Sequence, residues 1–97
     1  MSFEAVATEY FVRQLERFPE QSRRIIKSKV ELIKLDPFRY KRIHTKNFSH
    51  VYRIRLNIQG EESRLIYALL GDKVVFVCIL DRKHDYKDLE KHLESLK

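Results

Sequence analysis

Four arginines lie in or just after segments that read as strands, and arginine is a side chain well suited to binding phosphate. Arg53 and Arg55 flank Ile54, so in a strand both guanidinium groups project from one face, about 7 Å apart. Arg64 begins the next apolar segment, and Arg82 follows the third. The planar arginine fork forms bidentate, charge-assisted bonds with phosphate. Because cations converging from three strands repel one another unless an anion lies among them, we expect a phosphate-binding surface.

The positive charge of the chain is concentrated in residues 37–60. That segment holds six Lys or Arg, two His and no Asp or Glu, and the whole chain has a formal net charge of +6. A local excess of this kind indicates a polyanionic partner, and RNA is the first candidate. Apart from the arginines described above, the candidate RNA-binding residues are Arg39, Lys41, Arg42, Lys46 and Lys83.

Two titratable side chains, His84 and Tyr86, follow the third apolar segment, where a strand gives way to a helix. Arginine does not lose its proton in proteins, whereas histidine, with an ordinary pKa of about 6.5, suits proton transfer. If the chain cleaves RNA, His84 is therefore the first candidate base, followed by Lys46 and Tyr86. Tyr86 also falls on the apolar stripe of the last helix, so a packing role stays open. No His has metal-ligand spacing, and we expect neither a metal nor a cofactor.

The sequence has no nucleophile beside a base, no paired-carboxylate signature and no Gly-rich phosphate loop. RNA can be cleaved without them, because its own 2′-OH can attack the neighbouring phosphate. A protein then needs only to align that hydroxyl, neutralise the developing charge and manage two protons. A cluster of cations with one or two titratable groups is sufficient for this chemistry.

Hydrophobic periodicity predicts the elements that position these residues. Residues 3–7 form a short strand, Thr8 caps a first helix that ends at Pro19, and a second helix ends at Asp36. Residues 50–57, 64–70 and 73–80 form three strands, the last of them buried on both faces, and a short helix closes the chain. Residues 57–63, which contain Gly60, form the hairpin loop between the first two of these strands. The predicted order is β-α-α-β-β-β-α. This is an α+β fold with a helical hairpin packed on a mostly antiparallel sheet, whose other face is free for a ligand.

Length and composition indicate one small domain over residues 1–97. The single cysteine, Cys78, lies in an apolar run and reads as a buried, inert core thiol. One cysteine cannot form an internal disulfide, and residues 1–4 lack the pattern of a signal peptide. We therefore expect a cytoplasmic protein with no membrane partner.

Four segments follow one another in a recognisable order: residues 51–56 (VYRIRL), 63–67 (SRLIY), 74–77 (VVFV) and 81–86 (DRKHDY). In these segments the chain resembles the RelE toxins of bacterial and archaeal toxin–antitoxin systems, within the RelE/ParE superfamily. None is specific alone, but four in order behind a helical hairpin are fairly specific. The chain departs from the pattern in a longer turn before Arg64, in Ser63 at a usual tyrosine, and in Arg53 and Arg55 at positions where the best-known members have lysine.

The resemblance implies a RelE-like fold, similar to microbial ribonucleases. It implies a ribosome-dependent mRNA endonuclease, or mRNA interferase, that inhibits translation by metal-independent 2′-OH attack on the scissile phosphate. By this resemblance, Arg53 and Arg55 match the paired basic positions, and Arg64 matches the arginine that binds the scissile phosphate. Arg82 matches the cation near the leaving group, and Tyr86 the tyrosine that stacks on or orients the nucleotide.

The resemblance also implies two partners. One is the ribosome with mRNA in its A site. The other is a cognate RelB-like antitoxin, whose helix lies over the sheet or displaces the C-terminal helix. Two alternatives stay open: a ParE-like gyrase inhibitor that cuts no RNA, and a catalytically decayed RelE-like protein that still binds ribosome or antitoxin.

Overall fold

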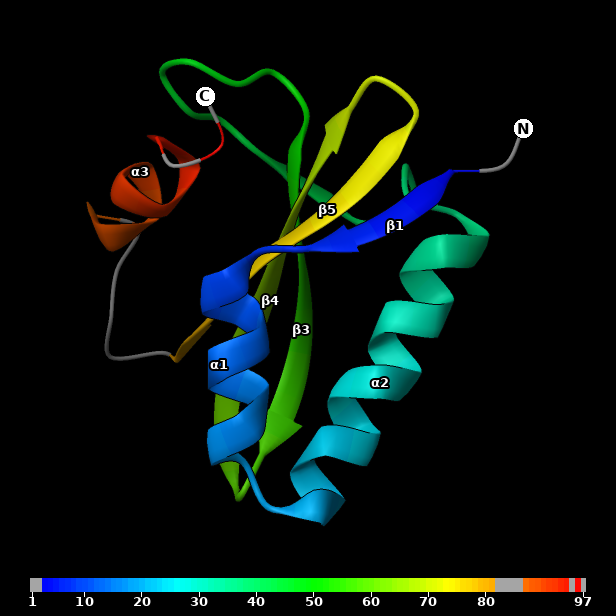
Figure 1. Ribbon diagram of the computed structural model, residues 1–97, viewed down its shortest axis with the longest axis vertical. Helices are drawn as coiled ribbons and strands as arrows, with labels where there is room; N and C mark the ends of the chain where they lie inside the picture. Colours follow the sequence, from blue (N-terminus) through cyan, green and yellow to red (C-terminus); the bar gives the residue numbers. More distant parts are fainter. Residues whose placement is uncertain (1–2, 82–86, 95, 97) are drawn as a thin grey trace.

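A five-stranded mixed sheet forms the centre of the fold (Figure 1). The computed structural model describes residues 3–81, 87–94 and 96. The strand order is β1-β5-β4-β3-β2, with β1 parallel to β5 and the other neighbours antiparallel. In chain order the elements are β1 Glu4–Ala7, α1 Glu9–Arg17, α2 Glu20–Leu35, β2 Lys41–Ile43, β3 Val51–Ile58, β4 Glu61–Leu70, β5 Lys73–Asp81 and α3 Lys87–Glu94.

The predicted α+β architecture is confirmed, with one strand more than expected. The added strand, β2, has only three residues and pairs with β3 at the sheet edge. Its sequence, Lys-Arg-Ile, has too few apolar residues to show an alternating pattern. The strand forms because β3 offers it a row of backbone hydrogen-bonding groups.

Helices α1 and α2 cover one face of the sheet, which we call the hairpin face. Helix α1 packs over β5 and α2 over β3. Helix α1 buries Phe11, and helix α2 buries Ile26 and Ile33. The strands contribute the alternate residues of β3, namely Tyr52, Ile54, Leu56 and Ile58, together with Leu65, Tyr67, Leu69, Val74, Phe76 and Ile79 of β4 and β5.

Helix α1 also closes the edge of β5 where the pairing with β1 stops. Thr8 caps α1 by accepting a hydrogen bond from the Phe11 N–H, and its hydroxyl donates to the Val77 carbonyl at 2.7 Å. Further along, the Gln14 side chain accepts from the Ile79 N–H at 2.7 Å and donates to the Ile79 carbonyl at 2.9 Å. The Gln14 amide thus substitutes for a neighbouring strand and satisfies backbone groups that would otherwise lack partners.

The opposite face of the sheet, which we call the far face, is partly covered, and the prediction of a free face was wrong. Helix α3 buries Leu89 and Leu93 against far-face residues of all three long strands, among them Val51, Ile66 and Val75. Figure 1 shows α3 on the other side of the strands from α2. The physical reason is β5 itself, whose unbroken apolar run must be covered on both faces.

The loop between β2 and β3 holds α3 against the sheet. Phe48 packs into the same apolar cluster as α3. The Asn47 side chain donates to Oε1 of Glu94 at 3.0 Å, and the backbone N–H of Lys46 donates to Oε1 of Glu90 at 3.4 Å. This loop and α3 therefore form one unit on the far face.

The turn between β3 and β4 is shorter than the sequence suggested. The strands continue to Ile58 and from Glu61, so Gln59 and Gly60 alone form the loop. Both have positive φ, 52° and 81°, as a type I′ turn requires. Residues 57, 58, 61 and 62, taken as loop in the sequence, are therefore paired strand residues, and each acquires a defined face.

The Gln14 contact to β5 gives a first prediction. Replacing Gln14 with Ala removes two hydrogen bonds from a strand edge, which should lower the free energy of unfolding by about 1–3 kcal/mol. Urea unfolding followed by circular dichroism measures the change. Replacement of Gln21, which is exposed on α2, is the matched control and should change stability by less than about 0.5 kcal/mol. Equal effects of the two substitutions contradict the role given to Gln14.

The packing of α3 against α1 gives a second prediction, on pH. The His92 ring stacks on Tyr10 with centroids 4.3 Å apart, and burial lowers the pKa of His92, with Asp88 opposing and Lys91 adding to the shift. The folded protein therefore binds this proton less readily than the unfolded chain. Its stabilising effect is complete above the ordinary histidine pKa of about 6.5 and is lost as pH falls through the lowered value.

Amide hydrogen exchange of α3 measures this effect. Protection of the α3 amides should fall between pH 7.5 and pH 5 after correction for the intrinsic exchange rate. In His92→Gln the pH dependence should flatten, whereas in His50→Gln, which alters an exposed histidine, it should stay. Unchanged pH dependence in His92→Gln contradicts the assignment.

Candidate nucleic-acid interface

The pairing of β3 with its two neighbours brings several predicted cations together. Arg55 lies directly opposite Arg64 of β4, and Arg53 lies opposite Ile66. On the other side of β3, Lys41 of β2 lies opposite Arg53. Directly opposed residues point to the same face of a sheet, so these cations share the far face. We call Lys41, Arg53, Arg55 and Arg64 the cationic cluster.

Buried aromatic residues on the hairpin face fix this register. Tyr52 lies opposite Tyr67, and their rings stack with centroids 5.4 Å apart. The Tyr67 hydroxyl donates to the Pro37 carbonyl at 2.6 Å. Burial raises the pKa of Tyr67 well above its usual range, so the hydroxyl keeps the proton it donates. A slip of one residue would turn the arginines toward the hairpin core and the tyrosines away from it.

An acidic side chain lies beside the cationic cluster. Oε1 of Glu62 is 3.5 Å from Nε of Arg55, and the two side chains are 37% and 64% exposed. Arg64 is half-buried, with its Nε atom inaccessible to solvent. Like charges directly opposite each other destabilise a strand pair. Glu62 offsets part of that repulsion, and a bound anion would offset more.

Sequence reasoning missed Glu62. Its spacing of two residues before Arg64 was visible, but residues 57–63 were read as a loop, where side chains have no fixed face. Once the short turn extends β4 back to Glu61, the alternation along the strand places Glu62 on the same face as Arg64. The signal that could have found it is the pair Gln59-Gly60, a two-residue turn with glycine at its second position.

The far face is divided between charge and apolar packing. The cationic cluster lies toward the β3–β4 turn, while the apolar cluster beneath α3 occupies the rest of the same face. Ile66 and Leu80, both buried, lie opposite Arg53 and Arg64 respectively and form the boundary. The arginines therefore project beside an apolar wall, where a phosphate is less hydrated and a charge-assisted bond is stronger.

Four predicted site residues lie outside the described residues: Arg82, Lys83, His84 and Tyr86. Strand β5 ends at Asp81, one residue after Leu80, which pairs with Arg64. Asp81 itself pairs with Ser63 and belongs to the hairpin face. The roles expected for these four residues remain predictions.

The other predicted RNA-binding residues are spread over the surface. Lys41 belongs to the cationic cluster, whereas its neighbour Arg42 lies opposite Tyr52 and points to the other face. Arg39 is exposed in the segment between α2 and β2, and Lys46 is exposed in the loop that contacts α3. Of the described residues in this group, Lys41 is the one whose strand pairing places it beside an arginine of β3.

The structure also describes the surroundings of Cys78 and of the side chains that could bind a metal. Cys78 is buried, as expected of a core residue, and burial raises the pKa of its thiol to about 12. Within residues 3–81, 87–94 and 96, no three His, Cys, Asp or Glu side chains gather closely enough to hold a metal ion. The described helices include none long and apolar enough to cross a bilayer.

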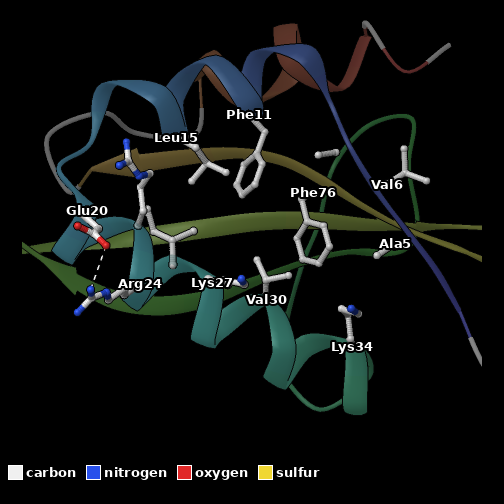
Figure 2. Close-up of a pocket in the computed structure, with 13 residues that line it drawn as sticks. Ala5, Val6, Phe11, Leu15, Glu20, Arg24, Lys27, Val30, Lys34 and Phe76 are labelled. Carbon is white, nitrogen blue, oxygen red and sulfur yellow. Dashed lines mark hydrogen bonds and ion pairs between the residues drawn. The ribbon is translucent and has the colours of Figure 1, made fainter.

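A separate groove of about 490 Å³ opens on the hairpin face between β1, α1 and α2. Figure 2 shows Phe11, Phe76 and Val30 along its floor, with Val6 of the β1 edge strand at one side. Its rim is mostly basic and is formed by Arg23, Arg24, Lys27 and Lys34, with Glu20 bound to Arg24. An apolar floor inside a cationic rim fits an amphipathic, acidic segment of another protein.

The chain is similar to known proteins in structure but not detectably in sequence. No protein-family model matches the chain, and no curated protein matches it by sequence. Solved structures do match, at low identity. The isolated RelE toxin of E. coli has a TM-score of 0.67 with 12% identity, covering 99% of this chain and 100% of the other.

Two complexes match as well, the first of them named as a toxin–antitoxin complex. The RelBE2 complex of Mycobacterium tuberculosis gives a TM-score of 0.59 with 20% identity, over 84% of this chain and 100% of the other. The archaeal RelE–RelB complex of Pyrococcus horikoshii gives 0.60 with 13% identity, over 88% and 100%. The fold implied by the sequence resemblance is thus confirmed, and this chain has the fold of the RelE toxins.

Proposed function

We propose that this chain is the toxin of a toxin–antitoxin pair and cleaves mRNA on the ribosome. The observation that carries the proposal is the opposition of Arg55 and Arg64 on the far face of a RelE-type sheet, with Arg53 one step along β3. Opposed guanidinium groups of this kind form a binding site for one phosphate with two forks. The net charge of +6 adds long-range attraction to ribosomal and messenger RNA.

The chemistry assigned to the cationic cluster is stabilisation of charge. When the 2′-OH attacks the neighbouring phosphate, negative charge grows on the non-bridging oxygens. Arg55 and Arg64 neutralise that charge, and Lys41 with Arg53 holds the adjacent backbone phosphates. These side chains stand on paired strands rather than loops, so little reorganisation accompanies the reaction. The products are a 2′,3′-cyclic phosphate and a 5′-OH.

The cognate partner is proposed to be an antitoxin with an acidic, amphipathic segment. Solved structures with this fold include two complexes named as toxin–antitoxin complexes and a third named as a RelE–RelB complex. In this chain the groove on the hairpin face offers such a segment both an apolar floor and a basic rim. Helix α3 on the far face is the second surface that an antitoxin helix could contact, as the sequence suggested.

Cleavage of mRNA on programmed ribosomes tests the proposed activity. Arg64→Ala removes one of the two opposed forks and should lower the single-turnover cleavage rate by about 10²–10³-fold. Arg17→Ala, which removes an exposed arginine of α1, is the matched control and should cleave like the unaltered chain. Far-ultraviolet circular dichroism verifies that both variants are folded.

Two outcomes would contradict the proposal, one its site and the other its activity. New RNA 5′ ends that persist in Arg64→Ala at the unaltered rate reject the placement of the site. DNA damage in cells without new mRNA 5′ ends supports a ParE-like gyrase inhibitor instead.

Binding of the antitoxin encoded beside the gene tests the proposed groove. Reversing charge at Lys27 and Lys34 together should slow association with an acidic antitoxin by about tenfold or more, with a weaker dependence on salt. The control reverses Arg13 and Arg17 on α1, which lie outside the groove lining. Surface plasmon resonance at two salt concentrations measures both. Equal slowing by the two double variants rejects the groove as the contact surface.

A further inference from the structure

Glu62 occupies an unusual place on the far face. Among the described residues of β2, β3, β4 and β5, the alternation and pairing of the strands put Glu62 on that face and put Glu61 and Asp81 on the hairpin face. Its carboxylate lies 3.5 Å from Arg55, on the strand that carries Arg64. Glu62 is thus the one acidic residue that the described parts of these four strands put on the far face, and it adjoins the proposed phosphate site.

We propose that Glu62 is the general base of the cleavage reaction, accepting the proton of the attacking 2′-OH. The proposal rests on the RNA cleavage proposed above. It assigns a role to a residue that neither the charge pattern nor the resemblance singled out.

The chemistry of the neighbouring side chains favours this role. The guanidinium groups of Arg53, Arg55 and Arg64 have no acceptor atom and keep their protons. A carboxylate offers two acceptor oxygens, and proton transfer requires a group within hydrogen-bond reach of the reacting hydroxyl. A phosphate held between Arg55 and Arg64 lies next to Glu62, because residues two apart on a strand are about 7 Å apart. Its 2′-OH is then within reach of a side chain of this length.

The ion pair with Arg55 explains how a carboxylate tolerates the approach of a phosphate. Alone, a negative side chain would repel the substrate. Here Arg55 lies between the two charges, with Nε toward Glu62 and the remaining guanidinium N–H groups available for phosphate oxygens. A role limited to balancing surface charge would need no fixed position. Glu62, however, is on a paired strand and only 37% exposed.

In the proposed step, the 2′ O–H bond breaks and its proton passes to a carboxylate oxygen of Glu62. The 2′ oxygen forms a bond to phosphorus while the bond from phosphorus to the 5′ oxygen breaks. The 5′ oxygen leaves with the bonding electron pair and takes a proton from water. Glu62 then returns its proton to solvent.

The test compares Glu62→Gln with Glu61→Gln in single-turnover cleavage of mRNA on programmed ribosomes. Glu61 is the adjacent strand residue on the opposite face, so its variant loses the same charge without touching the site. Glu62→Gln should lower the rate at saturating protein by about 10²–10⁴-fold, the usual contribution of a general base. Its affinity for ribosomes carrying a 2′-deoxy mRNA, which cannot be cleaved, should be unchanged or tighter. Glu61→Gln should match the unaltered chain in both measurements.

The pH profile separates a base from a residue that only orients Arg55. In the unaltered chain, the cleavage rate should rise tenfold for each pH unit over the acidic part of the pH profile, which we call the acidic limb. The profile of Glu62→Gln should lack this limb. Glu62→Ala should regain at least several-fold of its rate in added formate, which supplies a small carboxylate. A variant that binds more weakly yet keeps the limb overturns the proposal, as does full activity in Glu62→Gln.

The outcomes also distinguish failure of the general-base assignment from failure of the proposed mRNA cleavage. If the unaltered chain cleaves and Arg64→Ala does not, while Glu62→Gln keeps both rate and limb, only the assignment of the base fails. If the unaltered chain leaves mRNA intact on ribosomes, both the function and the base are rejected. Circular dichroism of each variant verifies folding, and the 2′-deoxy mRNA verifies that the binding surface is retained.

Discussion

The register between β3 and β4 is the constraint on which the rest of the site depends. Side chains alternate along a strand, so the pairing that buries Tyr52 against Tyr67 also puts Arg55 opposite Arg64. A slip by one residue would place guanidinium groups in the hairpin core, where an uncompensated charge costs several kcal/mol. The apolar core therefore fixes the charged surface.

The far face of the sheet carries both an apolar packing surface and the cationic cluster. Strand β5 is apolar along nearly its whole length and needs cover on both sides, which α1 and α3 provide. Helix α3 is only eight residues long, too short to cover the whole face. The cationic cluster lies on the part of the face beyond the described residues of α3. Placing the cluster beside buried Ile66 and Leu80 lowers the local dielectric constant, which strengthens binding to an anion.

Much of this arrangement could be predicted from the sequence, because strand alternation has a period of two. That period put Arg53 and Arg55 on one face, and the breaks at Pro19 and Asp36 set the helical hairpin. The position of α3 could have been predicted too: a strand read as buried on both faces cannot belong to a sheet with a free face. Strand β2 could not, because three residues carry no periodicity and its pairing comes from β3. Glu62 was missed for a local reason, since reading a seven-residue loop removed its face.

The choice of arginine at positions 53 and 55 separates binding from proton transfer. Lysine can do both, because a neighbouring charge or burial shifts its pKa toward neutrality, whereas arginine stays charged at every working pH. In this chain the arginines of the cationic cluster therefore stay charged across the pH range in which the protein works. Any pH dependence of the reaction must then come from a group that is not arginine. A carboxylate base is protonated, and so inactive, only at low pH, whereas a histidine base already becomes protonated near neutrality. The pH at which the cleavage rate falls therefore identifies the chemical class of the base.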